Sequence, residues 1–265
     1  MSNHIKAKFL GFGYGVISQE KFSQMIPDLS ESLRNRLPVH TRQPVQAVKV
    51  SLANENLNAH PETLGEELYM VDAKGLWGVR IGNRGIAITV AKYLEFEAVM
   101  HYLEDILRTL ADELRISHFS QVSLRNINLF KEVPGHPNKF ADINEGVHWG
   151  RQEIAALSSG FPCTGAATKH VYQSANELIQ LQLSSAVVMP SQSYIPQDEW
   201  GIWKLHGKIP ALEETQLMID ISSVAFQSAT DKLNGLSEYS WEMVSKEFNK
   251  LHDLVHKVYA DITKD

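Results

Sequence analysis

Apolar residues recur at helical spacing in two long segments of the chain, residues 94–114 and 237–263. The first stripe is Phe96, Val99, Met100, Leu103, Ile106, Leu107, Leu110 and Leu114, and the second is Trp241, Val244, Phe248, Leu251, Val255, Val258 and Ile262. Such a stripe is typical of an amphipathic helix that lies on another layer. The pattern therefore predicts two long helices, the second with Ser237 as its N-cap.

Strand-like runs occupy much of the remaining chain. The clearest hairpin spans residues 75–93, where two β-branched runs flank the turn Gly82-Asn83-Arg84-Gly85. Residues 18–37 are typical of a short helix interrupted near Pro27, and the polar residues 53–66 of turn and loop. Further strands are expected at 6–16, 44–52, 116–131, 170–189, around 201–209 and at 215–226. The later strands are expected to be antiparallel, because their connections are too short for helical crossovers.

Strands followed by a long helix occur twice, which predicts an α+β protein with two antiparallel sheets, each packed with one helix. A shift of 145 residues superposes Phe96 on Trp241 and Glu97 on Glu242, so an internal duplication is one explanation. The expected division is an N-terminal module at 1–132, a loop or linker at 133–169 rich in Pro, Gly, His and Asn, and a C-terminal module at 170–265.

Composition narrows the possible functions. The 25 basic and 31 acidic residues give a net charge of −6, so nucleic acid is not a favoured partner. The chain shows no secretory signal and no apolar run of about 18 residues that could span a bilayer, which predicts a cytoplasmic protein without membrane contact. Cys163 is the single cysteine, so neither a disulfide framework nor a cysteine-based zinc site is expected.

The strand QVSLRNINLF, residues 121–130, carries polar residues where a buried strand should be apolar. Alternation puts Val122, Leu124, Asn126, Asn128 and Phe130 on one face and Ser123, Arg125, Ile127 and Leu129 on the other. A buried Arg125 needs a carbonyl or carboxylate partner, such as a helix glutamate or Asp220. Arg125, Asn126 and Asn128 therefore form either a structural polar network or a ligand-binding site, and both interpretations stay open.

Two other patterns have a structural and a functional interpretation. Residues 11–15, GFGYG, lack the last glycine of a dinucleotide fingerprint, so a plain turn is favoured over a phosphate site. His252 and His256 have the i, i+4 spacing of zinc ligands, but no third ligand can be placed. A solvated helix flank is favoured for them, and neither a metal nor a cofactor is expected.

Cysteine and aromatic residues supply the remaining candidates. Cys163 would be a nucleophile only if His148 or His170 met it in space, and a plain loop is favoured. Tyr194, Trp200 and Trp203, close to Lys204 and His206, form an aromatic cluster. Core packing is the favoured interpretation of this cluster, and a recognition surface is the alternative.

The chain resembles a sporadically distributed family of bacterial proteins of unknown function, about 250 to 270 residues long. The resemblance covers residues 44–265 and rests on PVQAVKVSL, KYLEFEAVMHYLEDIL, SLRNIN and LHDLVHKVYADIT. Ala47 stands where a glutamate is expected, and 43 residues precede the matching part. The resemblance transfers no catalytic residue, and it implies an accessory gene of the kind found near defence or toxin modules.

These observations predict a non-enzymatic protein that binds another protein, in the manner of an antitoxin or a chaperone. Its expected binding surface combines the 133–169 loop, including His148 and Trp149, with Tyr194, Trp200 and Trp203. The alternative is an enzyme or a binder of small anions with a site between the modules, where Arg125 and Asn128 grip the anion. Self-association through a helix stripe is a further alternative.

Overall fold

A computed structural model describes residues 4–53, 56–92, 94–144, 167–174, 178–227 and 235–264, without the side chains of residues 47–62, 137 and 138. Its strands are β1 (Ile5–Tyr14), β2 (Val39–Ala53), β3 (Asn56–Val71), β4 (Trp77–Gly82), β5 (Gly85–Val90), β6 (His118–Val133), β7 (His136–Phe140), β8 (Ala167–Gln173), β9 (Ile179–Val188), β10 (Gln216–Phe226) and β11 (Ser237–Glu238). Its helices are α1 (Gln19–Leu33), α2 (Phe96–Leu114), α3 (Trp200–Leu205) and α4 (Trp241–Ile262), with a 3-10 turn at Gln197–Glu199 before α3.

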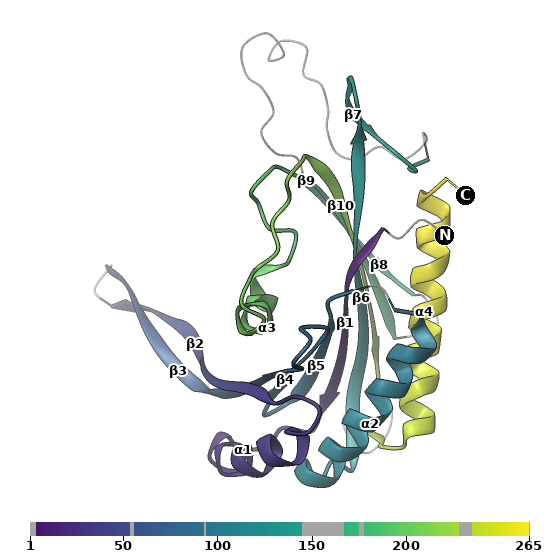
Figure 1. The fold of residues 1–265 in the computed structure, drawn as a ribbon. Helices are drawn as coiled ribbons and strands as arrows, with labels where there is room; N and C mark the ends of the chain where they lie inside the picture. Colours follow the sequence, from purple (N-terminus) through teal and green to yellow (C-terminus); the bar gives the residue numbers. More distant parts are fainter. Residues whose placement is uncertain are drawn as a thin grey trace.

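The described strands form one antiparallel sheet, so the prediction of two sheets, each packed with its own helix, is wrong. The order across the sheet is β2-β3-β4-β5-β1-β6-β10-β9-β8, and the short strands β7 and β11 also pair with β6 (Figure 1). The two halves of the chain meet where β1 pairs with β6, from Ile5 opposite Asn128 to Tyr14 opposite Phe119. The predicted module boundary at residue 132 lies at the end of this central strand β6.

The two halves share one feature on either side of the β1–β6 pair. In the first half the last strand, β5, pairs with the first, β1, and α2 follows; in the second half β10 pairs with β6, and α4 follows. Leu10 and Leu124 face each other at the centre of this arrangement. The two predicted long helices are confirmed, and they start at Phe96 and Trp241.

Helices α1, α2 and α4 all cover one side of the sheet, which we call the helix face (Figure 1). Leu10 of β1 and Leu124 of β6 join the core on this face, together with Phe22 of α1, Leu103 of α2 and Phe248 of α4. Burial of these apolar stripes is the main stabilising contribution that the sequence pattern predicts.

The other side of the sheet is crossed by residues 189–215, which connect β9 to β10 and contain α3. We call this connection the strap and this side the strap face. Ile195 and Trp203 of the strap pack on Phe9 of β1 and Ile127 of β6, while Ile202 packs on Tyr69 of β3. In Figure 1, α3 lies on the opposite side of the sheet from the three larger helices.

Two segments have a different secondary structure from the one predicted. Residues 53–66 were expected to be loop, but β3 pairs with β2 from Asn56 opposite Ala53 to Val71 opposite Val39. Residues 201–209 were expected to be a strand, but most of them lie in α3 and its end. The Gly82–Gly85 hairpin is confirmed.

Two glycines of β1 and the N-cap of α4 also differ from the predictions. Gly11 and Gly13 lie inside β1 rather than in a turn. A Cβ on either residue would collide with side chains of β6, which explains why glycine occupies both positions. Helix α4 is capped by Ser240, whose Oγ accepts a hydrogen bond from the Met243 amide at 3.2 Å, and the predicted cap Ser237 lies in β11. Pro27 lies within α1 without ending it.

Candidate functional site

Arg125 of β6 lies on the strap face and has a carboxylate partner on the neighbouring strand. Its Nη2 donates to Oδ2 of Asp220 at 2.6 Å, and its Nε donates to Oδ1 at 3.0 Å. The Asp220 side chain is 5% exposed and that of Arg125 is 24% exposed. Burial lowers the pKa of the guanidinium, but the hydrogen bond to Asp220 and the charges of Asp220, Asp198 and Glu199 together raise that pKa overall. This fork-like pairing meets the need for a partner that the sequence indicated.

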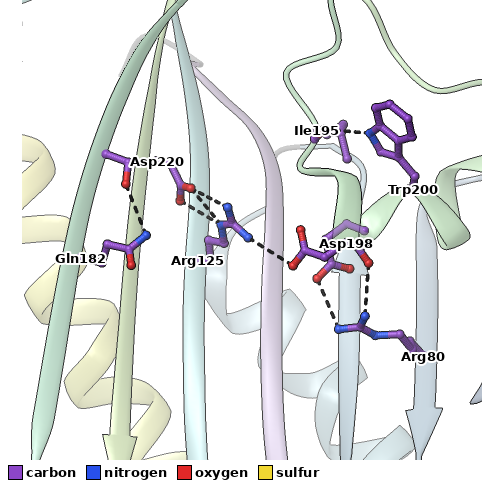
Figure 2. A network of polar contacts seen from close by, with 9 residues as sticks. Arg80, Arg125, Gln182, Ile195, Asp198, Trp200 and Asp220 are labelled. Carbon is purple, nitrogen blue, oxygen red and sulfur yellow. Dashed lines mark hydrogen bonds and ion pairs between the residues drawn. The ribbon is translucent and has the colours of Figure 1, made fainter. Parts of the chain in front are cut away.

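A second arginine, Arg80 of β4, reaches the same region from the other half of the sheet. Its Nη1 donates to the main-chain oxygen of Asp198 at 3.2 Å, and its Nη2 lies 3.6 Å from Oε1 of Glu199. Nη1 of Arg125 lies 3.9 Å from Oδ2 of Asp198. Figure 2 shows Arg80 and Arg125 extending toward Asp198 from two sides. The two arginines therefore hold the strap onto both halves of the sheet.

Glu199 is the most unusual member of this network. It is only 5% exposed, and among the described residues no donor reaches its Oε2. Burial raises the pKa of its carboxyl above the ordinary value, and Arg80 opposes this shift. A carboxylate in such a place is destabilising unless it is protonated or acquires a further donor.

Acidic groups outnumber basic groups around Glu199. Glu67 of β3 also faces Arg80, and its Oε2 accepts a hydrogen bond from the Tyr69 hydroxyl at 2.9 Å. Burial and Glu67 together raise the pKa of Tyr69 to about 12. Glu67, Asp198, Glu199 and Asp220 bring four carboxyl groups to two guanidinium groups. This arrangement suits a positively charged group better than an anion.

Asn126 and Asn128 do not share a site with Arg125, because alternation along β6 places them on the helix face. Asn128 is fully buried, and its Nδ2 donates to the Ile219 carbonyl at 3.1 Å. Asn126 is opposite the buried Lys8 of β1, whose Nζ donates to the Leu94 carbonyl at 3.2 Å. The structure therefore separates the three predicted ligand-binding residues into two groups on opposite sides of the sheet.

The predicted aromatic cluster packs mainly against the sheet. Trp203 is 6% exposed and contributes to the core under the strap. Trp200 is half-buried, and its Nε1 donates to the Ile195 carbonyl at 2.9 Å. Tyr194 is also half-buried, and burial raises its pKa. The favoured interpretation of core packing agrees with these positions, and partner binding by these residues stays a prediction.

The histidine pair of α4 lies beside the helix core. The His252 ring stacks on Phe96 at 3.8 Å between centroids, and its centroid is 6.1 Å from that of the exposed His256. Burial and the nearby Lys8 lower the pKa of His252. Across the described residues, no three potential ligands come together to hold a metal ion. His148, Trp149 and Cys163 lie outside the described part of the chain.

Two members of the network, Arg80 and Glu199, were not predicted from the sequence. Arg80 had a usable signal, since it alternates with the apolar residues Val79 and Ile81 in a strand that was recognised. Glu199 had none, because it lies in an irregular strap whose path over the sheet depends on contacts distant in sequence.

A scan against family models and a search of curated proteins found no match to this chain. The family resemblance noted in the sequence therefore stays a prediction. Within the described residues, no helix is both long enough and apolar enough to cross a membrane.

Proposed function

We propose that the protein is an accessory protein that binds another protein, and that its docking arm is the ribbon formed by residues 43–53 and 56–67. The observation that carries this proposal is the pairing of β3. It pairs with β2 along nearly its whole length, but with β4 only from Leu68 to Val71. In the described structure, the rest of β2 and β3 has no third strand.

The ribbon projects from the body of the protein (Figure 1). From Gln43 to Ala53 it extends over about 35 Å, at about 3.3 Å per residue. A two-stranded ribbon is marginally stable in water on its own, and its unpaired edges are templates for another chain. A partner that covered the ribbon would supply the third layer or strand that it lacks.

The base of the ribbon packs against α1 and the helix-face core, so the arm is anchored to the body of the protein. Gly65 has a φ of 154° at a register shift between β2 and β3, and a Cβ there would overlap the side chain of Gln19 in α1. Leu68 is fully buried in the helix-face core. Along the near part of the arm, Leu64 is 51% exposed, so an apolar side chain is available to a partner.

The alternative of a small anion held by Arg125 and Asn128 has less support. These two side chains lie on opposite faces of the sheet, and Arg125 is already paired with Asp220. A guanidinium already held by a carboxylate has fewer N–H donors left for an anion. We therefore base the proposed function on the ribbon. The proposed role is that of an antitoxin-like or chaperone-like accessory protein.

Site-specific photo-crosslinking in the native host tests the proposal. A photoreactive amino acid at Gln46, which is exposed on the ribbon, should give one crosslinked species with a polypeptide of defined mass. The same amino acid at Lys246, exposed on α4, is the matched control and should not give that species. Equal crosslinking at both positions, or none at Gln46, would contradict the proposal.

A shortened variant provides an independent readout. Gln46 and Thr63 are opposite each other, so an Asn-Gly turn can replace residues 47–62 and close the hairpin. We expect native mass spectrometry to show the partner with the intact protein and not with the variant. The near-ultraviolet circular dichroism of the two proteins should agree, since the shortened part lies outside the sheet core.

A further inference from the structure

Glu199 is only 5% exposed, yet its Oε2 atom has no hydrogen-bond donor in the described structure. Buried polar atoms almost always have partners, and an exception calls for an explanation such as a bound group. Burying a carboxylate oxygen without a donor lowers the stability of the folded protein.

Neither neighbouring arginine supplies the missing donor. Arg125 directs two nitrogen atoms at Asp220, and Arg80 divides its guanidinium between the Asp198 carbonyl and Oε1 of Glu199. The 3.6 Å separation between Arg80 and Glu199 is that of an ion pair longer than a normal hydrogen bond. Oε2 of Glu199 thus receives no donor from either arginine.

Asp198, the residue before Glu199, places a second carboxyl group of the strap at the surface. The Asp198 side chain is 61% exposed, whereas that of Glu199 is 7% exposed. On the sheet below, Ala87, Gly11 and Ser123 form one row across β5, β1 and β6, and all three are partly exposed. This row of small residues continues from Arg80, whereas the bulky Phe9 of β1 lies beside Arg125.

The chemistry of this place selects the ligand. Two carboxyl groups, one buried and one at the surface, can accept the several N–H donors that an ammonium or guanidinium group presents. An anion would meet four carboxyl groups with both arginines already engaged. We infer that Glu199 and Asp198 bind a primary ammonium or guanidinium group on the strap face. This site adjoins the base of the ribbon, where Glu67 faces Arg80, but the inference does not depend on the proposed function.

The test uses the full-length protein and small cations. Butylamine and ethylguanidine are titrated in turn, while the Nε–H signals of Arg80 and Arg125 are followed by nuclear magnetic resonance. We expect saturable shifts that equal concentrations of sodium chloride and butanol do not produce. Shifts that track ionic strength alone would overturn the inference.

Variants locate the binding. Glu199→Gln keeps the shape and removes the charge, so it should weaken cation binding at least tenfold, while Glu97→Gln, an exposed glutamate on α2, should bind as the native protein does. Asp198→Asn, at an exposed position, should weaken binding severalfold without affecting the fold. Unchanged binding by Glu199→Gln would overturn the inference.

A series of peptides distinguishes a cationic side chain of another protein from a small-molecule amine as the ligand. Short capped peptides with a central lysine or arginine are compared with the free amines, and a glutamine peptide is the uncharged control. Tighter binding of the charged peptides would identify a side chain of a protein as the ligand. Equal or weaker binding would identify a small-molecule amine. Failure of every cation would overturn this inference and leave the ribbon proposal untouched.

Discussion

The two faces of the sheet use different physical interactions. The helix face buries large apolar side chains, among them Phe22, Phe119, Phe130 and Phe248, each less than 2% exposed. The strap face has a smaller apolar contact and a network of charged residues centred on Arg125 and Asp220. Apolar burial has no preferred direction, whereas a fork-like ion pair forms in one geometry. The helix face thus provides most of the stability, and the strap face fixes the position of an irregular segment.

The largest effect expected from this comparison is on the helix face. Phe248→Ala in α4 removes a fully buried ring, and we expect the free energy of unfolding to fall by about 4 kcal/mol. Equilibrium unfolding in urea measures it. Met243→Ala, at a half-exposed position on the same helix, should leave the stability nearly unchanged. A small effect of Phe248→Ala would show that the helix face is not the main core.

A second, smaller loss is expected on the strap face. Arg125→Ala leaves Asp220 buried without its partner, and we expect a loss of about 3 kcal/mol in urea unfolding. Combining it with Asp220→Ala removes the uncompensated charge, so the double variant should be more stable than Arg125→Ala alone. Arg108→Ala removes an exposed pair with Glu104 and should have little effect. Additive losses in the double variant would contradict coupling of Arg125 to Asp220.

The smallest expected effect concerns pH and Glu199. Its folded-state pKa is raised, so the folded protein binds a proton more readily than the unfolded chain does, and this carboxyl destabilises the fold as pH rises through that pKa. The native protein should therefore gain stability relative to Glu199→Gln as pH is lowered from 8 toward 5. Thermal unfolding of both proteins at each pH measures the difference.

Comparing the native protein with Glu199→Gln also removes the effect of histidine protonation on stability. Burial lowers the pKa of His206 and of His252, so both destabilise the fold as pH falls below their ordinary value. Their contribution is common to the native protein and to Glu199→Gln and cancels in the difference. A stability difference that does not change with pH would contradict a raised pKa at Glu199.

Much of the local structure could be predicted from the sequence. The helices at Phe96–Leu114 and Trp241–Ile262 and the Gly82–Gly85 hairpin follow from periodicity and turn chemistry that act within a few residues. The ribbon could be predicted only in part. The alternation at residues 44–52 predicted a strand there, which lies within β2, but the polar residues 53–66 resemble a loop and were not recognised as the partner strand.

The candidate site was predictable in part. Arg125 in an otherwise buried strand required an acidic partner, and Asp220 was among the candidates because burial penalises an unpaired charge wherever it occurs. Grouping Arg125 with Asn126 and Asn128 followed their closeness in sequence, whereas a strand sends alternate side chains to opposite faces. Arg80 and Glu199 are brought to Arg125 by the strap and by the order of strands.

By itself, the sequence determined the two long helices, the Gly82–Gly85 hairpin and the need of Arg125 for a buried partner, because these properties depend on neighbouring residues and on the cost of desolvation. Only the tertiary structure decided that β1 and β6 join both halves into one sheet, that three helices share one face, and that the strap brings Glu199 between Arg80 and Arg125. The physical reason is that strand pairing and loop placement depend on contacts between residues far apart in the chain, which periodicity does not record.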